Sequence, residues 1–261
     1  FGAAGNTTDG YAAGGQNFES TVDKLTYSSD TTARIPGANL TAGTAYLKGT
    51  SSTTAAYFGG GQNPSYSSIS TMNKTSYSTD TSSVVPGAAL AATRDSMGST
   101  GNTSSSGYFA GGWNTDSNVK SEAYKLTYST ETTAATPSAN VSIARDDIGA
   151  TSAIGDNLPF AAPPTPTPSP STSLAPPSSS PTPNTGYFAG GGNPGDGSIG
   201  GYTSVADKTN FSNDTTAASP SANLSTPRTT PVGNSSITHG YFGGGRNGPG
   251  GADASNMDKL N

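Results

Sequence analysis

The feature that most constrains this chain is that it repeats itself. An aromatic–glycine motif, such as GYFAGG from Gly107, occurs five times at intervals of about 50 residues, with one longer gap. Two further motifs, DKLTYSSDTT from Asp23 and PGANL from Pro36, recur in the same register. The motif tyrosines are Tyr11, Tyr57, Tyr108, Tyr187 and Tyr241. Three motifs that recur in the same register indicate repeated structural units that pack on one another.

Each repeat has the pattern of a small antiparallel sheet. Short β-prone runs, such as Gly107 to Ala110 and Lys125 to Tyr128, are separated by Asp-Thr-Thr, Pro-Gly or Gly-Asn turns. Helical periodicity is rare, and proline or glycine interrupts it. Because a four-stranded sheet of about 50 residues cannot bury its faces alone, the units must pack radially in a propeller or linearly in a stack. We therefore predict an all-β fold.

The order of these motifs also carries a resemblance. An aromatic strand, Gly-Gly, a tyrosine strand, a Pro/Leu segment and an arginine together resemble the kelch repeat of β-propellers. More narrowly, GYFGGG followed by DKxxYSxDTT and PSANLSxxR resembles kelch-like arrays in tail-fibre and other proteins of marine bacteriophages, including cyanophages. The resemblance implies a kelch-like β-propeller of about five four-stranded repeats. The sequence departs from kelch where small or aliphatic residues replace an expected tryptophan, near Ala33, Val84, Ala134 and Ala217.

The repeats occupy residues 1–154 and 186–261, and a segment rich in Pro, Ser and Thr separates them at 155–185. Dense proline presets polyproline II geometry and removes backbone donors, so this insertion is predicted to be an extended loop. Two alternatives are an O-glycosylated stalk and a strut that contacts a neighbouring subunit. Candidate glycosylation sites are Thr165, Thr167 and Ser169 in the insertion and the sequon residues Asn39, Asn140 and Asn223 in the repeats.

Both ends of the chain fall inside a repeat. Phe1 aligns with Met97, near the end of one repeat, and the final MDKLN starts another. We therefore expect four complete repeats and a fifth that is split between the termini, or else a segment of a longer array. If Phe1 to Gly15 pairs with Tyr241 to Leu260 of the same molecule, the ring closes; if it pairs with a neighbour, a filament grows.

Composition excludes several classes of site. The chain has no cysteine, and His239 is its single histidine, so thiolate, cysteine–zinc and multi-histidine chemistry are excluded. The net charge of −5 with scattered basic residues argues against nucleic acid as a partner. No apolar run approaches the roughly 18–20 residues of a membrane span. We expect no cofactor, no metal and no membrane insertion.

Aromatic residues after the glycine motif are the candidate ligand-binding residues. Trp113 directly follows GYFAGG, and Tyr66 and Tyr202 occupy the equivalent turn regions of other repeats. Such rings can stack on saccharides from one rim, although an aromatic residue in a glycine-rich turn often only covers neighbouring backbone. The diglycines lack the context of a phosphate-binding loop and indicate close backbone packing.

Charged residues recur once per repeat. The acidic positions each precede threonine and are interpreted as turn residues, because one carboxylate per repeat does not supply the clustered oxygens that calcium needs. The arginines are expected to pair with carboxylates or backbone carbonyls, and Asp95, Asp146 and Asp147 beside them make local pairing available. The alternative is that the arginines bind an anion at a rim. Asp146 and Asp147 are expected to diverge, which suits no glycosidase. The recurring residues are Asp30, Asp80, Glu131 and Asp214, and Arg94, Arg145 and Arg228.

These patterns predict a non-enzymatic structural or adhesive protein of an extracellular fibre, filament or virion appendage. It would act by self-assembly or surface attachment, with itself, other fibre subunits or cell-surface glycans as partners. The alternative is a soluble, lectin-like propeller that binds carbohydrate through its rim aromatics. No catalytic residues are assigned.

Overall fold

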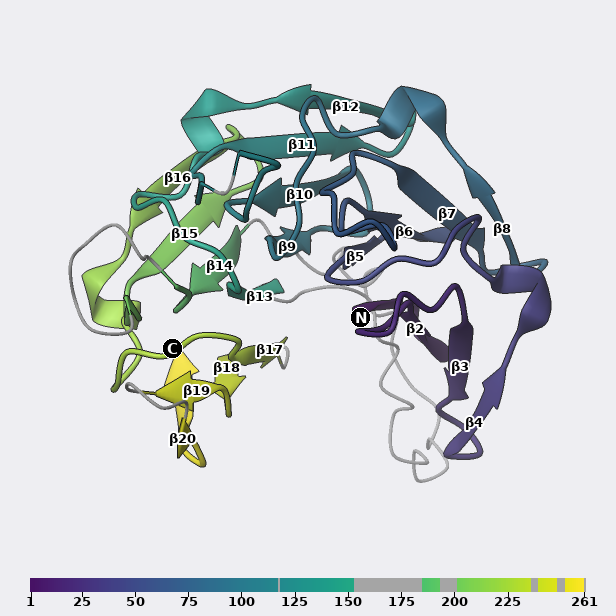
Figure 1. The fold of residues 1–261 in the computed structure, drawn as a ribbon. Coiled ribbons are helices and arrows are strands. Elements are labelled where there is room, and N and C mark those ends of the chain that lie inside the picture. The colour runs from purple at the N-terminus through teal and green to yellow at the C-terminus, as the bar shows by residue number, and fades with distance from the viewer. Residues whose placement is uncertain (117, 153–184, 193–200, 236–238, 248–251, 261) are drawn as a thin grey trace, which may run out of the picture.

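The computed structural model describes residues 1–116, 118–152, 185–192, 201–235, 239–247 and 252–260. Five antiparallel sheets are arranged around a common centre as the blades of a five-blade β-propeller (Figure 1). The predicted all-β propeller is therefore confirmed. Helix is limited to four short 3-10 turns in the described part of the chain.

Each of the first four blades has four strands, which run in chain order from the centre outwards. Blade 1 contains β1 (Gly2–Gly5), β2 (Asp9–Ala13), β3 (Val22–Thr26) and β4 (Thr31–Arg34). Blade 2 contains β5 (Lys48–Ser51), β6 (Ala55–Gly59), β7 (Met72–Ser76) and β8 (Thr81–Val84). Blade 3 contains β9 (Gly98–Gly101), β10 (Ser106–Ala110), β11 (Ala123–Thr127) and β12 (Thr132–Ala135). Blade 4 contains β13 (Gly149–Ser152), β14 (Thr185–Ala189), β15 (Ala206–Asn210) and β16 (Thr215–Ala218).

Blade 5 has three described strands, β17 (Val232–Ser235), β18 (Gly240–Gly243) and β21 (Met257–Leu260), beside a small hairpin of β19 (Arg246–Asn247) and β20 (Ala252–Asp253). The expectation of an incomplete terminal repeat is confirmed. The expected split of one repeat between the termini is not what forms, because β1 pairs with β2 of its own blade. The next strand along the chain, whose first pair is Gly5 with Gly10, closes a shorter loop than a strand from the far end of the chain.

The Pro/Leu motif forms the 3-10 turn that follows each outer strand. These turns are η1 (Pro36–Ala38), η2 (Pro86–Ala88), η3 (Pro137–Ala139) and η4 (Pro220–Ala222). Proline fits the first position of such a turn because its fixed φ matches and its missing N–H would have no partner there. The apolar residue two positions after each turn is buried, at Leu40, Leu90, Val141 and Leu224.

The inner strands of neighbouring blades approach so closely that only small residues fit between them. A Cβ on Gly49 would lie 2.4 Å from the carbonyl oxygen of Ala3 in blade 1, and a Cβ on Gly233 would lie 2.1 Å from that of Ala150 in blade 4. Hydroxyls add cross-blade bonds, as from Ser99 Oγ to the Gly49 carbonyl at 2.7 Å. The abundance of Gly, Ala, Ser and Thr is therefore a requirement of propeller packing.

The Tyr-Phe pair of the aromatic motif serves two different junctions. Because side chains alternate along a strand, Tyr57 faces blade 3 while Phe58 faces blade 1. Both side chains are buried. A single dipeptide thus contributes to the hydrophobic cluster on each face of its blade, which is why the motif recurs with little change.

A second aromatic residue stacks on the motif tyrosine across each of three junctions. Tyr77 of blade 2 lies over Tyr11 of blade 1 with ring centroids 5.3 Å apart. The glycine before the motif tyrosine makes room for such a ring, since a Cβ on Gly107 would lie 2.9 Å from Tyr128 Oη. The other two stacked pairs are Tyr57 with Tyr128 and Tyr108 with Phe211.

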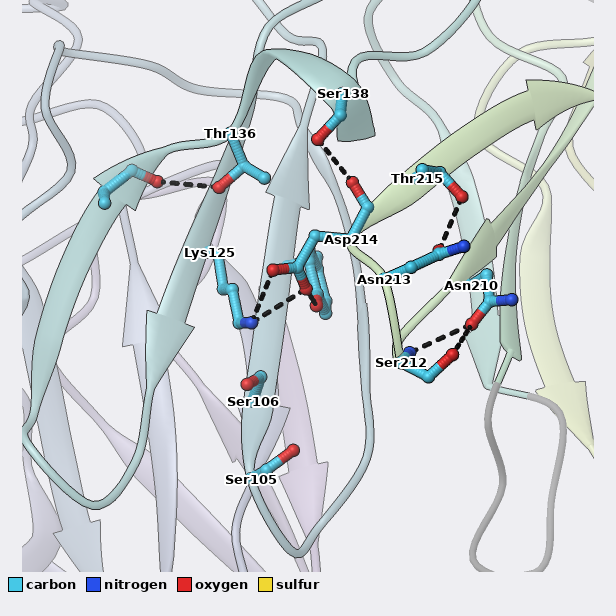
Figure 2. A network of polar contacts seen from close by, with 12 residues as sticks. Ser105, Ser106, Lys125, Thr136, Ser138, Asn210, Ser212, Asn213, Asp214 and Thr215 are labelled. Carbon is cyan, nitrogen blue, oxygen red and sulfur yellow. Dashed lines mark hydrogen bonds and ion pairs between the residues drawn. The ribbon is translucent and has the colours of Figure 1, made fainter.

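In blades 2, 3 and 4 the recurring acid of the outer turn is held by the preceding blade, and we call this contact the clamp. Lys125 of blade 3 donates to both carboxylate oxygens of Asp214 in blade 4, at 2.7 and 2.8 Å (Figure 2). Tyr108 donates to the same carboxylate. Equivalent clamps hold Asp80 through Tyr11 and Lys24, and Glu131 through Tyr57 and Lys74.

The clamp revises the interpretation of these acids as turn residues alone. Each does occupy a turn in the left-handed region, with φ of +50° at Asp80 and +55° at Asp214. Its carboxylate, however, joins two blades. Hydrogen bonding from Lys74 holds the pKa of Glu131 below its ordinary value, and burial together with Asp80 raises the pKa of Tyr11 to about 12.

The recurring arginines are buried and join consecutive blades instead of binding an anion at a rim. Arg145 donates to Asp207 at 2.7 Å and to the Phe188 carbonyl at 3.3 Å, and both charged side chains are fully buried. Arg228 repeats the arrangement with Asp258, while Arg94 pairs with Glu122. The expected pairing of the arginines with carboxylates and backbone carbonyls is confirmed, but their partners are residues of the next blade and not the adjacent aspartates.

Removing one partner of the buried pair will be costly. Asp207→Ala leaves the Arg145 guanidinium buried without a counter-charge, so we expect a loss of about 3–5 kcal/mol in unfolding free energy. Lys74→Met, in a half-exposed clamp, will cost only about 0–1 kcal/mol. Urea denaturation of both variants measures the difference, and equal losses would contradict this assignment.

The close packing of the inner strands predicts that adding a single methyl group at a contact glycine will lower the stability of the protein. Gly233→Ala pushes β17 away from the Ala150 carbonyl and should destabilise the protein by about 1–3 kcal/mol. Gly15→Ala is the matched control, because its Cβ would meet only the Glu19 side chain, at 3.5 Å. Thermal unfolding should leave the control within about 0.5 kcal/mol of wild type.

Candidate functional site: the central cavity

A cavity of about 920 Å³ lies where the inner strands converge, and we call it the central cavity. Each of the five inner strands lines it with one equivalent small residue, namely Ala3, Gly49, Ser99, Ala150 and Gly233. Small side chains at this position leave the centre open. A second cavity of about 280 Å³ is lined by residues further along the same strands, among them Thr50, Thr100 and Thr151.

Left-handed residues form the entrance to four inner strands. Tyr46, Ser96, Asp147 and Thr230 have φ between +48° and +55° and all line the central cavity. Their backbones form a chain of hydrogen bonds from blade to blade, in which each N–H donates to the preceding carbonyl at 2.7–3.1 Å. This ladder fixes the backbone at four equivalent positions and leaves their side chains to vary.

The structure brings together two of the three candidate aromatic residues. Trp113 and Tyr202 line the central cavity and are half-buried, at equivalent turns of blades 3 and 4. The Trp113 indole N–H donates to the Asp146 carboxylate, which fixes the ring. Tyr66 does not join them: it is 76% exposed and packs edge-on against Phe18.

Two carboxylates share the cavity, contrary to the expectation that Asp146 and Asp147 diverge. The left-handed conformation of Asp147 breaks the strand alternation that would have separated them. Burial raises the pKa of Asp146 to about 7, and the charge of Asp147 contributes to the rise, whereas backbone hydrogen bonds from Asp146 and Gly192 oppose it. Burial also raises the pKa of Asp147 and lowers that of Lys48, which lines the same cavity.

This set of groups suits a polyhydroxylated ligand. Aromatic rings offer flat apolar surfaces, while the aspartates, Lys48 and backbone groups can bond to hydroxyls. No group of three or more metal-ligating side chains occurs in the part of the chain that the structure describes. A carboxyl group with a pKa near 7 in a cavity also marks the site as a functional candidate.

The candidate glycosylation residues have mixed placements. Asn39, Asn140 and Asn223 follow 3-10 turns, and the side-chain oxygens of the last two accept the backbone N–H groups of Ala123 and Ala206. These contacts hold the start of a neighbouring strand. Thr165, Thr167 and Ser169 lie outside the described residues, as does most of the predicted insertion. Glycosylation stays a prediction.

Sequence reasoning missed Lys48 and Tyr46. Neither belongs to a motif, and the position of Lys48 is glycine or valine in the other blades. That departure from the repeat was the available signal. None of the helices among the described residues is long and apolar enough to cross a membrane.

The raised pKa of Asp146 predicts a pH-dependent stability. Between pH of about 4 and about 7 the folded protein retains a proton that the unfolded chain has lost, so unfolding free energy falls as pH rises through this window. Asp146→Asn should reduce the fall in unfolding free energy across this pH window by roughly 1–4 kcal/mol. Asp116→Asn, at an exposed aspartate outside the cavity, serves as control in urea titrations from pH 4 to pH 8. A variant slope equal to that of wild type would contradict the assignment.

Comparison with known proteins supports the fold. No protein-family model matches the chain, and neither does any curated protein sequence. The solved structure of YjhT is similar, with a TM-score of 0.70 and 14% sequence identity, over 98% of this chain and 79% of that one. At this identity the likeness shows the fold alone, and the chain shares a propeller-like architecture with YjhT.

Proposed function

We propose that this chain is a non-enzymatic structural and adhesive protein of an extracellular fibre, filament or virion appendage, and that it attaches to surface glycans through the central cavity. The observation that carries the proposal is the convergence of Trp113, Tyr202, Asp146 and Asp147 on one cavity of about 920 Å³. The resemblance of the repeats to phage tail-fibre arrays supports the extracellular or virion setting.

The chemistry of the cavity favours a carbohydrate over an apolar ligand. A sugar ring presents an apolar face to an aromatic side chain and hydroxyls at its edge. Trp113 is held by its bond to Asp146, so little side-chain freedom is lost on binding. Carboxylates beside an aromatic ring accept hydroxyl bonds, which gives specificity for the arrangement of hydroxyl groups.

A glycan array followed by titration of the best ligand tests this function. Trp113→Ala and Tyr202→Ala should each weaken binding by about two- to tenfold, since a stacking contact contributes roughly 0.5–1.5 kcal/mol. Trp113→Phe keeps a stacking face and should lose less. Tyr66→Ala is the matched control, because Tyr66 lies outside the cavity lining.

Two results would contradict the proposal. Unchanged binding in Trp113→Ala would remove the cavity as the glycan site. Conversion of the bound glycan to a new product, abolished by Asp146→Asn, would overturn the non-enzymatic part.

A further inference from the structure

Three junctions between blades share one arrangement of four side chains. The upstream blade supplies a tyrosine and a lysine from paired strand positions, as Tyr11 and Lys24 do. The downstream blade supplies an acid and a stacking aromatic, as Asp80 and Tyr77 do. The arrangement recurs between blades 2 and 3 and between blades 3 and 4.

The downstream face of blade 5 carries the donor half of this arrangement. Tyr241 of β18 and Lys259 of β21 are register partners, just as Tyr11 and Lys24 are. Among the described residues no carboxylate forms an ion pair with Lys259, which is exposed. Tyr241 is only half-buried, whereas the clamped tyrosines Tyr11, Tyr57 and Tyr108 are buried.

The upstream face of blade 1 carries the acceptor half. Asp30 has φ of +51°, in the same turn position as Asp80, but it is exposed and has no ion-pair partner in the described ranges. Tyr27, in the position of the stacking aromatic, is 43% exposed, compared with 8% for Tyr128. Leu25 is 38% exposed, while its equivalent Leu126 is fully buried.

These two faces do not cover each other within one molecule. Hydrophobic clusters join blades 1 to 2, 2 to 3, 3 to 4 and 4 to 5, and none in the described chain joins blade 5 to blade 1. In Figure 1, β17 and β18 lie at one end of the arc of blades, and the N-terminus and β2 lie at the other end. Among the described residues, blade 5 therefore presents a donor half and blade 1 an acceptor half that are opposite in charge.

We propose that the downstream face of blade 5 binds the upstream face of blade 1 of a second copy of this chain, with Tyr241 and Lys259 clamping Asp30 and with Tyr27 stacking on Tyr241. The inference deepens the proposed fibre role and rests on it for biological meaning. The interface is heterologous, since two different surfaces meet. Because the five blades already curve around most of one axis, successive copies must be offset along that axis, which produces a helical filament.

Charge reversal tests the interface on the full chain. Wild type should show a mass that rises with concentration in sedimentation experiments and fibres in electron micrographs. Asp30→Lys and Lys259→Asp should each weaken association by at least tenfold. The double variant restores opposite charges across the interface and should recover association. Asp116→Lys, an equal charge change at an exposed site elsewhere, should behave as wild type.

Mixing the two single variants sharpens the test. The Asp30→Lys copy retains Lys259 and the Lys259→Asp copy retains Asp30, so one junction of the mixture has the native pair and the other has the reversed pair of the double variant. The mixture should therefore recover association with the two variants alternating, whereas each variant alone should not associate. A wild type that stays monomeric at all concentrations overturns the proposal, whether the ends remain free or close on each other. Failure of the double variant to recover association overturns it as well.

The readouts keep the two proposals separable. Glycan binding that is lost in Trp113→Ala but retained in the charge variants supports the cavity independently of assembly. Filaments that persist in Asp30→Lys would leave the fibre role standing and remove this interface.

Discussion

The structure depends on the burial of blade faces against neighbouring blades. A sheet of small residues has too little apolar area to be stable alone, so the junction between blades is the unit of stability. The Tyr-Phe dipeptide meets this constraint by sending one ring to each side, as Tyr57 and Phe58 do. Inner-strand glycines such as Gly233 then allow the backbones to approach closely.

Charged groups at these junctions lie at two depths. Near the outer rim the clamp is half-exposed, and its lysines contribute modestly to stability while fixing which surface meets which. Deeper in the junction, the side chains of Arg145 and Asp207 are fully buried. Removing either partner leaves the other as an unpaired buried charge, which destabilises the folded protein. Each junction thus combines non-directional burial with contacts that accept only one register.

The central cavity results from this packing, and the side chains that line it differ from blade to blade. The backbone ladder through Ser96 and Asp147 constrains φ and hydrogen bonding but not side-chain identity. Tyr46, Ser96, Asp147 and Thr230 can therefore differ while the scaffold stays the same. Trp113 was recognisable from the sequence because it departs from the repeat, and so were the turn positions of Tyr66 and Tyr202. The sequence did not show that Trp113 and Tyr202 line the cavity while Tyr66 lies on the surface, because this difference depends on how each turn bends.

The sequence by itself determined the repeat, the strands and the turn chemistry, because glycine, proline and alternating β-prone residues act over a few positions. It also marked every clamp residue, since Tyr11, Lys24 and Asp80 belong to recurring motifs. Only the tertiary structure decided that the acid of one repeat pairs with the lysine of the preceding one, and that Arg145 pairs with Asp207 instead of its neighbour Asp146. These choices depend on the angle between packed sheets, and that angle is set by contacts between residues 50 or more positions apart.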